Sequence, residues 1–409
     1  MKSSAETTNE PAAERPQGTP GEVFSAFLKL GLTSFGGPIA HLGYFRDELV
    51  VRRRWIDEAG YGDLVALCQF LPGPASSQVG FALGLLRGGP LGALAAWAAF
   101  TLPSALLLVA FAMASTAFGG VVGSGLLHGL KIVAVAVVAQ AVWGMAKSLT
   151  PDRERAAIAL LAVLIVVFSA TAAGQIAAIV AGALAGLLFC RNGPAATSGH
   201  LSFRVSRRFG AACLAAFLLL LVLLPVAAAT AGSQGLSLFD AFYRAGSLVF
   251  GGGHVVLPLL QTEAVGRGWV SAGDFLAGYG AAQAVPGPLF TFAAYLGAVS
   301  GPAPNGFVGA TIALVAIFLP GFLLLLGALP FWDHFRRRPL AQAAMRGANA
   351  AVVGILGAAL YSPVSTSAIL GPRDFALALA GFVLLVAWKM PPWIVVALLA
   401  AGGVGLAML

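Results

Sequence analysis

The chain has 409 residues, of which 59% are hydrophobic and 10% are charged, and its mean hydropathy is +0.89. A soluble domain carries roughly 25% charged residues, so this composition excludes a soluble globular protein and indicates an integral membrane protein. The net charge of +8 comes from basic residues at the ends of apolar segments. Membrane topology accounts for that pattern, so we expect no nucleic-acid partner. No ten-residue alternation suggests a barrel, and the membrane segments are therefore predicted to be helices.

Residues 1–20 are polar and Pro-rich and lack an apolar core, which predicts a disordered tail and not a signal peptide. Two broken apolar segments follow, interrupted at Phe35-Gly36-Gly37-Pro38 and at Pro72-Gly73-Pro74. Their half-helices are too short for the ~30 Å hydrocarbon core of a bilayer. Four ordinary spans complete this first repeat, residues 21–190, at roughly 91–117, 122–148, 155–170 and 173–190.

A basic loop and one lone apolar span, together residues 191–236, join this repeat to a second one at residues 237–409. The second repeat has the same order of elements. Its broken segments and spans are predicted at about 238–262, 274–300, 307–331, 340–361, 374–389 and 392–408.

The two repeats share motifs at a nearly constant offset. Phe250-Gly251-Gly252 lies 215 residues after Phe35-Gly36-Gly37, and Pro286-Gly287-Pro288 lies 214 residues after Pro72-Gly73-Pro74. Matched Gly and Pro residues within apolar sequence rarely arise by chance. We therefore interpret the chain as an internal duplication.

The positive-inside rule places the basic loop in the cytoplasm. We then count spans from this loop toward both ends of the chain. The basic clusters in the loops between spans fall on the cytoplasmic side. The two repeats then have opposite orientations in the membrane. The N-terminus is then cytoplasmic. The predicted fold is an all-α polytopic membrane protein, with two inverted-topology repeats of broken or re-entrant helices joined by one linking helix. Nine full spans with four hairpins is our preferred count, and thirteen full crossings is the alternative.

Each break leaves the first N–H groups of the following half-helix unpaired and partly positive, which favours an anion. Close helix packing alone would explain an isolated break. Four matched breaks, with half-helix termini near Pro38, Ala75, Gly253 and Leu289, instead predict one transporter site near the membrane midplane. The predicted substrate-binding residues are Phe35, Gly36, Gly37, Gln69, Pro72, Gly73, Pro74, Ser76, Ser77, Phe250, Gly251, Gly252, Gly253, His254, Gln283, Pro286, Gly287, Pro288 and Thr291.

A second group of residues is predicted to attract the anion or to couple its movement to another ion. Lys29 and Arg244 occupy equivalent positions in apolar sequence, where the alternative is that they extend to the nearer interface. The matched glutamates either carry coupling protons or pair with nearby Arg. The histidines near the breaks either sense pH or bind the anion, or they only pack. The whole group is Lys29, Arg244, Lys131, Asn349, Glu48, Glu263 and His41.

Other chemistry has little support in the sequence. Cys68, Cys190 and Cys213 are isolated, and neither a nucleophile with its base nor a cofactor or metal motif occurs. We therefore expect no enzymatic activity, no metal and no cofactor. A passive anion channel is a further alternative, which inverted duplication disfavours.

These motifs resemble the chromate ion transporter family, the CHR superfamily, in its long bidomain form. The resemblance covers about residues 20–409 and implies export of chromate across the bacterial inner membrane. It also implies coupling to the proton-motive force, chromate resistance and competition by sulfate. The first half has Pro38 where the second has Gly253, so unequal contributions are expected. The resemblance rests on both Phe-Gly-Gly motifs, both Pro-Gly-Pro motifs with their preceding Gln, and on His254, Trp55, Trp269 and Asn349-Ala350-Ala351-Val352-Val353-Gly354.

Overall fold

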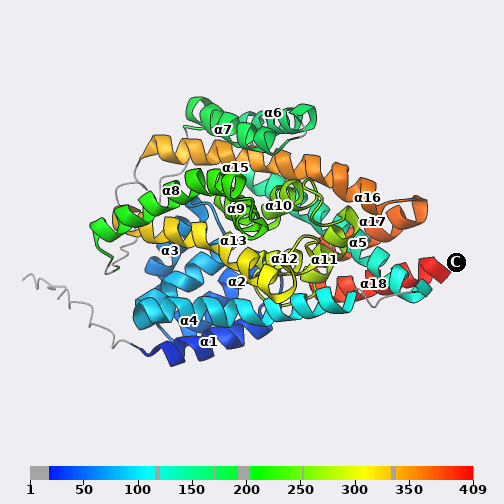
Figure 1. The fold of residues 1–409 in the computed structure, drawn as a ribbon. Helices are drawn as coiled ribbons and strands as arrows, with labels where there is room; N and C mark the ends of the chain where they lie inside the picture. Colours follow the sequence, from blue (N-terminus) through cyan, green and yellow to red (C-terminus); the bar gives the residue numbers. More distant parts are fainter. Residues whose placement is uncertain are drawn as a thin grey trace, which may run out of the picture.

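The computed structural model describes residues 18–115, 120–169, 171–191, 203, 205–250, 253–332 and 338–408. Within these residues every regular element is a helix, which confirms the all-α prediction. The long helices α4, α13 and α15 run across Figure 1 in roughly one direction. Most of the predicted tail lies outside the described residues, and the first helix begins at Pro20.

Five helices are long and apolar enough to cross a membrane. Four further helices, of 15 to 18 residues, occupy the remaining predicted spans but are shorter than the roughly 20 residues of a straight crossing. The long helices are α4 (Ala75–Ser115), α5 (Gly120–Leu149), α8 (Arg207–Ala231), α13 (Gly306–Ala328) and α15 (Pro339–Ala359). The shorter ones are α6 (Arg153–Ser169), α7 (Ala172–Phe189), α17 (Pro372–Val386) and α18 (Pro392–Met408).

The helices are interrupted where Gly and Pro interrupt the apolar sequence. In the first half the elements around the breaks are α1 (Pro20–Thr33), α2 (Gly37–Phe45), the π-helix η1 (Arg46–Arg52), α3 (Glu58–Phe70) and the start of α4. In the second half they are α9 (Gln234–Ser247), η2 (Gly253–Val255), α10 (Val256–Ala264), α11 (Ala272–Ala282), η3 (Leu289–Thr291) and α12 (Phe292–Val299). Helix α4 is also kinked at Gly88 and Gly89, whose backbone angles are not helical.

Three short elements complete the described fold. The turn η4 (Leu329–Phe331) extends α13, and η5 (Leu360–Ser365) and α16 (Thr366–Ala368) extend α15.

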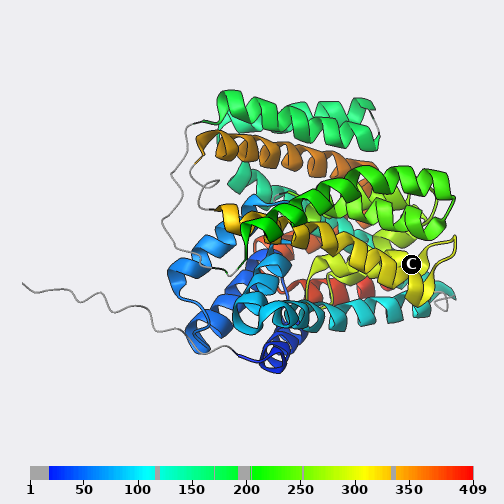
Figure 2. The same ribbon diagram turned by 60° about the vertical axis from the view of Figure 1, so that its left-hand side comes forward.

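The two halves are interleaved and are not two separate bodies. Helix α5 of the first half packs along α17 and α18 of the second half, whereas α15 of the second half packs along α6 and α7 of the first. Figures 1 and 2 both show α15 beside the α6–α7 pair. Each long central helix therefore rests on the terminal helical pair of the other half.

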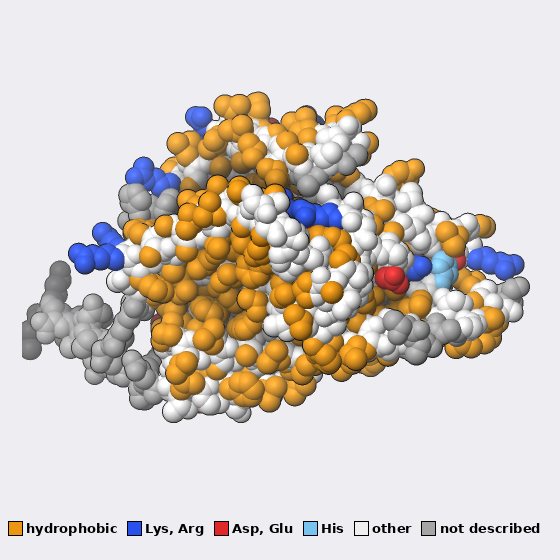
Figure 3. All heavy atoms as spheres, viewed as in Figure 1, with side chains coloured by type: hydrophobic (Ala, Val, Ile, Leu, Met, Phe, Trp, Pro, Cys, Tyr) orange, Lys and Arg blue, Asp and Glu red, His pale blue; other side chains and the backbone are white. Residues whose placement is uncertain are grey.

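The surface fits a bilayer. Figure 3 shows apolar side chains over most of the visible face, while Lys and Arg gather at its two ends and over α10. Large apolar side chains that would be buried in a soluble protein are exposed on the helices, for example Leu106, Val222 and Leu184. Lipid tails can cover such an apolar surface and keep it from water, so the chain is a multi-pass membrane protein.

Candidate functional site

Each Pro-Gly-Pro break is hydrogen-bonded to the Phe-Gly-Gly region of the other half. The Gly73 N–H donates to the Val249 carbonyl oxygen at 2.8 Å, and the Gly287 N–H donates to the Ser34 carbonyl oxygen at 2.9 Å. Both glycines have positive φ, 121° and 103°, a region that residues with a Cβ enter at a cost. The Pro-Gly-Pro break of each half therefore contacts the Phe-Gly-Gly region of the other half, although the two are far apart in the sequence.

Side chains reinforce these crosswise contacts. The Gln78 amide nitrogen donates to Pro72 O at 3.1 Å and to Gly321 O of α13 at 2.9 Å. On the other side, the Ser104 hydroxyl of α4 lies 2.9 Å from the Thr291 hydroxyl. The first Pro-Gly-Pro break thus rests on α13, and the second rests on α4.

A cavity of about 70 Å³ lies between the start of α2, His254 of η2 and the second Pro-Gly-Pro break, and none of Pro72, Gly73 and Pro74 lines it. One water needs roughly 10–15 Å³ of such space, so the cavity has room for a small hydrated ion or several waters. Helix α2 begins at this cavity. Gly36 and Gly37, at the start of the helix, line the cavity and have positive φ angles of 98° and 80°. The complete lining is Gly36, Gly37, Val137, Gln140, His254, Ala282, Gln283, Val285, Gly287, Leu289 and Pro392.

The His254 ring spans from a buried tyrosine to the cavity. Its Nδ1 lies 2.7 Å from the Tyr279 hydroxyl oxygen. Its Nε2 would lie 4.0 Å from a Cβ built on Gly37, so that nitrogen faces the start of α2. When the tyrosine hydroxyl donates to Nδ1, the neutral imidazole carries its proton on Nε2 and presents an N–H donor there.

The two halves contribute unequally to the cavity. Gln283 lines it, whereas its counterpart Gln69 is exposed and does not. His41 is buried, with Nδ1 3.3 Å from the Ser76 hydroxyl, and does not line the cavity either. His41 therefore takes a different position from His254.

The remaining predicted motif residues lie in or beside the breaks. The Phe35 ring lies 6.5 Å from the Trp393 ring of α18, and Phe250 is partly buried. Ser77 is buried, and its hydroxyl has no hydrogen-bond partner among the described residues. Gly251 and Gly252 fall outside the described residues. The rest are at the breaks themselves: Pro74, Gly253, Pro286 and Pro288.

Four of the predicted charged residues form ion pairs with one another, and none of the four lines the cavity. Lys29 Nζ lies 3.1 Å from Glu48 Oε2, and Arg244 Nη2 lies 3.1 Å from Glu263 Oε1. Each cation of the duplicated pair therefore contacts the glutamate of its own repeat. This arrangement matches the ion-pair interpretation of the two glutamates.

Lys131 and Asn349 lie elsewhere. Lys131 of α5 is partly buried beside Gly273 near the start of α11, and Asn349 lies within α15. The Asn349 Oδ1 is buried and accepts no hydrogen bond from the described residues. Neither side chain lines the cavity.

The predicted site residues do not include Gln140 and Pro392, nor the apolar lining residues Val137, Ala282, Val285 and Leu289. Gln140 is an amide within the apolar stretch of α5 from Ile132 to Val142, and an isolated polar residue at membrane depth is itself a signal. Pro392 begins α18 and carries no chemical signal. Only the packing of the terminal helices brings it to the site.

Comparison with known proteins decides the family. The protein-family model described as chromate transporter matches residues 21–187 and 236–406, which is most of the chain. The chain belongs to the chromate transporter family. This confirms the resemblance inferred from the motifs.

Curated relatives in the chromate transporter family align over nearly the full length. A chromate transport protein of Pseudomonas aeruginosa is 32% identical over 94% of this chain and 91% of its own length. A probable chromate transport protein of Synechococcus elongatus is 28% identical over 92% of this chain and 93% of its own length. A chromate transport protein of Cupriavidus metallidurans is 28% identical over 89% of this chain and 87% of its own length. No solved structure matches the chain.

Proposed function

We propose that this member of the chromate transporter family is a secondary active transporter that exports chromate across the bacterial inner membrane. Export would confer chromate resistance. The observation that carries the proposal is the cavity at which the Pro-Gly-Pro break of one half is bonded to the Phe-Gly-Gly region of the other. The names of the aligned relatives supply the substrate.

In this proposal a tetrahedral dianion binds through neutral donors. The first N–H groups of α2, near Gly36 and Gly37, face it together with the His254 imidazole and the Gln140 and Gln283 amides. Neither Lys nor Arg is among the described lining residues, so the anion is held by hydrogen bonds and a helix dipole. Binding without a fixed countercharge lets the site release its ion as well as bind it.

Transport would proceed by alternating access of two inverted repeats. The exchange of helical partners, with α5 on α17–α18 and α15 on α6–α7, supports a pseudo-symmetric relation between the halves. One repeat rocks against the other about the crosswise bonds and opens the cavity to each side in turn. The proton-motive force drives this cycle, and the N-terminus faces the cytoplasm. A homodimer is one assembly compatible with the fold.

Another oxyanion such as sulfate is the main alternative substrate. Backbone N–H groups and amides recognise charge and tetrahedral shape, which chromate and sulfate share. A passive anion channel is a second alternative. The sequence duplication favours two-state access over a permanently open path.

Uptake of chromate into everted membrane vesicles tests the proposal. We expect energised vesicles to accumulate chromate, an uncoupler to abolish the accumulation, and excess sulfate to compete at most partially. Flux that persists without the proton gradient and follows only the chromate gradient would establish a channel. Sulfate uptake that chromate barely inhibits would establish a sulfate transporter.

Replacing Tyr279 by phenylalanine should lower the kcat/KM of chromate transport roughly fivefold, which is the net value of one hydrogen bond. The change removes the hydroxyl that lies 2.7 Å from His254 Nδ1 and leaves the imidazole in place. The matched control is Tyr295→Phe, which removes a hydroxyl bonded to Asp274 O at 3.0 Å outside the cavity lining. Equal rates for the two variants would show that the Tyr279 contact does not tune the site.

A further inference from the structure

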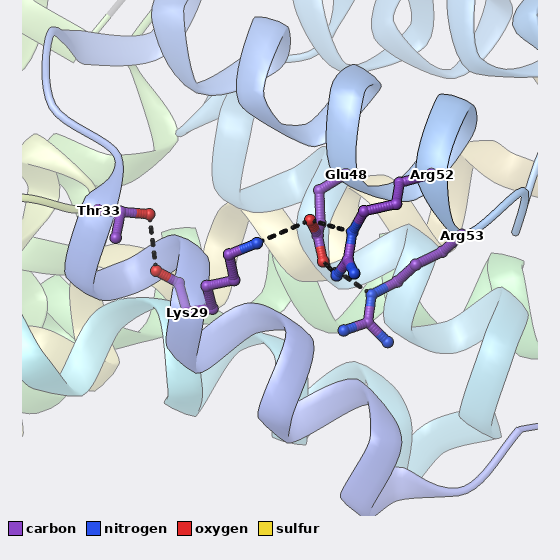
Figure 4. A network of polar contacts seen from close by, with 5 residues as sticks. All are labelled: Lys29, Thr33, Glu48, Arg52 and Arg53. Atoms are coloured by element: carbon purple, nitrogen blue, oxygen red, sulfur yellow. Dashed lines mark hydrogen bonds and ion pairs between the residues drawn. The ribbon is translucent and has the colours of Figure 1, made fainter.

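A buried carboxylate in the first half is surrounded by three cations. Glu48 is 7% exposed, and it pairs with Lys29 at 3.1 Å, with Arg53 at 2.9 Å and with Arg52. Figure 4 shows Lys29 reaching from α1 and the two arginines reaching from the end of η1 toward this one carboxylate. We call these four residues the Glu48 cluster. Its formal charge is +2.

The equivalent cluster in the second half is neutral. Arg244 and Arg267 pair with Glu263 at 3.1 and 2.8 Å, and Arg244 also pairs with Asp240 at 3.0 Å. These four residues lie 215 positions after Ser25, Lys29, Glu48 and Arg52.

Two positions account for the whole difference in charge. The acid Asp240 corresponds to Ser25, and Arg53 belongs to the run Arg52-Arg53-Arg54 before Trp55, for which the second half has the single Arg267 before Trp269. The first half therefore lacks one carboxylate and has one additional guanidinium. Arg87 lies nearby over the Trp55 ring, but it forms an ion pair with Glu22 at 3.0 Å, which balances its charge. The surplus of two positive charges remains with the Glu48 cluster.

The surplus is accessible to an ion. The side chains of Lys29 and Arg52 are 58% and 56% exposed, and that of Arg53, which packs over the Trp55 ring, is 24% exposed. Arg53 uses Nε for its bond to Glu48, and Figure 4 shows its two terminal nitrogens on the side away from that carboxylate. A guanidinium presented in this way can bind two oxygens of a tetrahedral oxyanion at once.

We propose that the Glu48 cluster is a capture site on the cytoplasmic face, where the transported oxyanion binds before it enters the cavity. This inference rests on the proposed function. Lys29 precedes the cavity residue Gly36 by seven positions, and α1 ends between them at Thr33. A dianion is neutralised by a cluster of charge +2, and a local surplus of charge raises the concentration of a counter-ion near an entrance. The neutral second-half cluster lacks this attraction, so capture operates at one face only.

The test uses two variants that each lower the cluster charge from +2 to +1, by different routes. Ser25→Asp installs the acid of the second half at an exposed position, four residues before Lys29, as Asp240 stands four residues before Arg244. Arg53→Gln removes the additional charge and keeps a polar side chain. Ser25→Asn is the matched neutral control. Initial chromate uptake is measured against chromate concentration in everted vesicles, whose outer face is cytoplasmic, at about 10 mM and about 300 mM KCl.

At low salt we expect the KM for chromate to rise about 3- to 10-fold in Ser25→Asp and in Arg53→Gln, with Vmax unchanged. Ser25→Asn should behave as wild type. At high salt the difference should disappear, because the Debye length falls from about 30 Å at 0.01 M to well below 10 Å. Equilibrium dialysis of the purified proteins with chromate should show the same salt-dependent loss of affinity.

Three results would overturn the inference. The first is an unchanged KM with unchanged binding in both charge variants. The second is an effect that appears only in right-side-out vesicles. The third is an effect that requires anionic lipid and vanishes in liposomes of neutral lipid, since the cluster would then hold a lipid phosphate. If wild-type vesicles take up no chromate, the proposed function fails, and the dialysis experiment still decides the capture site.

Discussion

Replacing Gly287 by valine should reduce chromate transport by about 100-fold while the protein still inserts into the membrane. Gly287 has a φ of 103°, where a β-branched residue is strongly disfavoured. A Cβ there would lie 3.1 Å from Phe100 O and 3.2 Å from the Ser104 hydroxyl. The Gly287 N–H bond to Ser34 O would be displaced with it. A displacement of about 1 Å at a reacting site costs on the order of 100-fold in an enzyme, and we expect a similar penalty here.

The control for this variant separates backbone strain from damage to the site. Gly268 also has a positive φ, 71°, but no atom lies within 4 Å of a Cβ built on it. Gly268→Val should therefore transport at close to the wild-type rate. Uptake is normalised to the amount of inserted protein. If Gly287→Val and Gly268→Val transport equally well, the crosswise bond is not required. The partner break offers an independent replicate, because Gly73→Val would place its Cβ 3.1 Å from Gly321 Cα.

Replacing Gly347 by leucine should prevent stable folding. Helices α15 and α7 cross so closely here that a Cβ on Gly347 would lie 2.6 Å from Gly186 Cα and closer still to Gly182 O. Small residues allow such approach between membrane helices, and a larger side chain forces the backbones apart. Overpacking of this kind costs about 3 kcal/mol or more, a large fraction of the net stability of a folded protein.

A second glycine of the same helix provides the comparison for this variant. Gly357 also lies in α15, and nothing lies within 4 Å of a Cβ built on it. Gly357→Leu should give the wild-type yield after solubilisation and the wild-type Tm. Gly347→Leu should aggregate, or melt at least about 5 °C lower. Indistinguishable size-exclusion profiles and melting temperatures for the two variants would contradict the close helix crossing.

Much of the architecture follows from local sequence. A Pro or Gly in apolar sequence removes a hydrogen bond or loosens the backbone wherever it occurs, so helix ends near Phe35, Pro72, Leu248 and Gln283 could be predicted without tertiary information. The first ordinary span was predicted to start near residue 91, and the helical backbone angles of α4 are indeed interrupted just before it, at Gly88 and Gly89, where two helical parts join at a kink.

The cavity was only partly predictable. Local motifs identified Gly36, His254 and Gln283, because Gly and polar side chains at a helix break are unusual in themselves. They also suggested Gln69, which is exposed, since the repeat pattern carries no information about which copy faces the cavity. Gln140 and Pro392 come from helices without a break and reach the cavity only through helix packing.

Sequence alone determined that this is a duplicated, helical membrane protein of the chromate transporter family with a pair of helix breaks in each half. Those properties depend on composition, on apolar length and on residues that interrupt a helix wherever they stand. Tertiary structure decided that each Pro-Gly-Pro break bonds to the other half's Phe-Gly-Gly region and that Lys29 pairs with Glu48. Such contacts join residues far apart in the chain, and only the packing of the helices sets which backbone groups and charges meet.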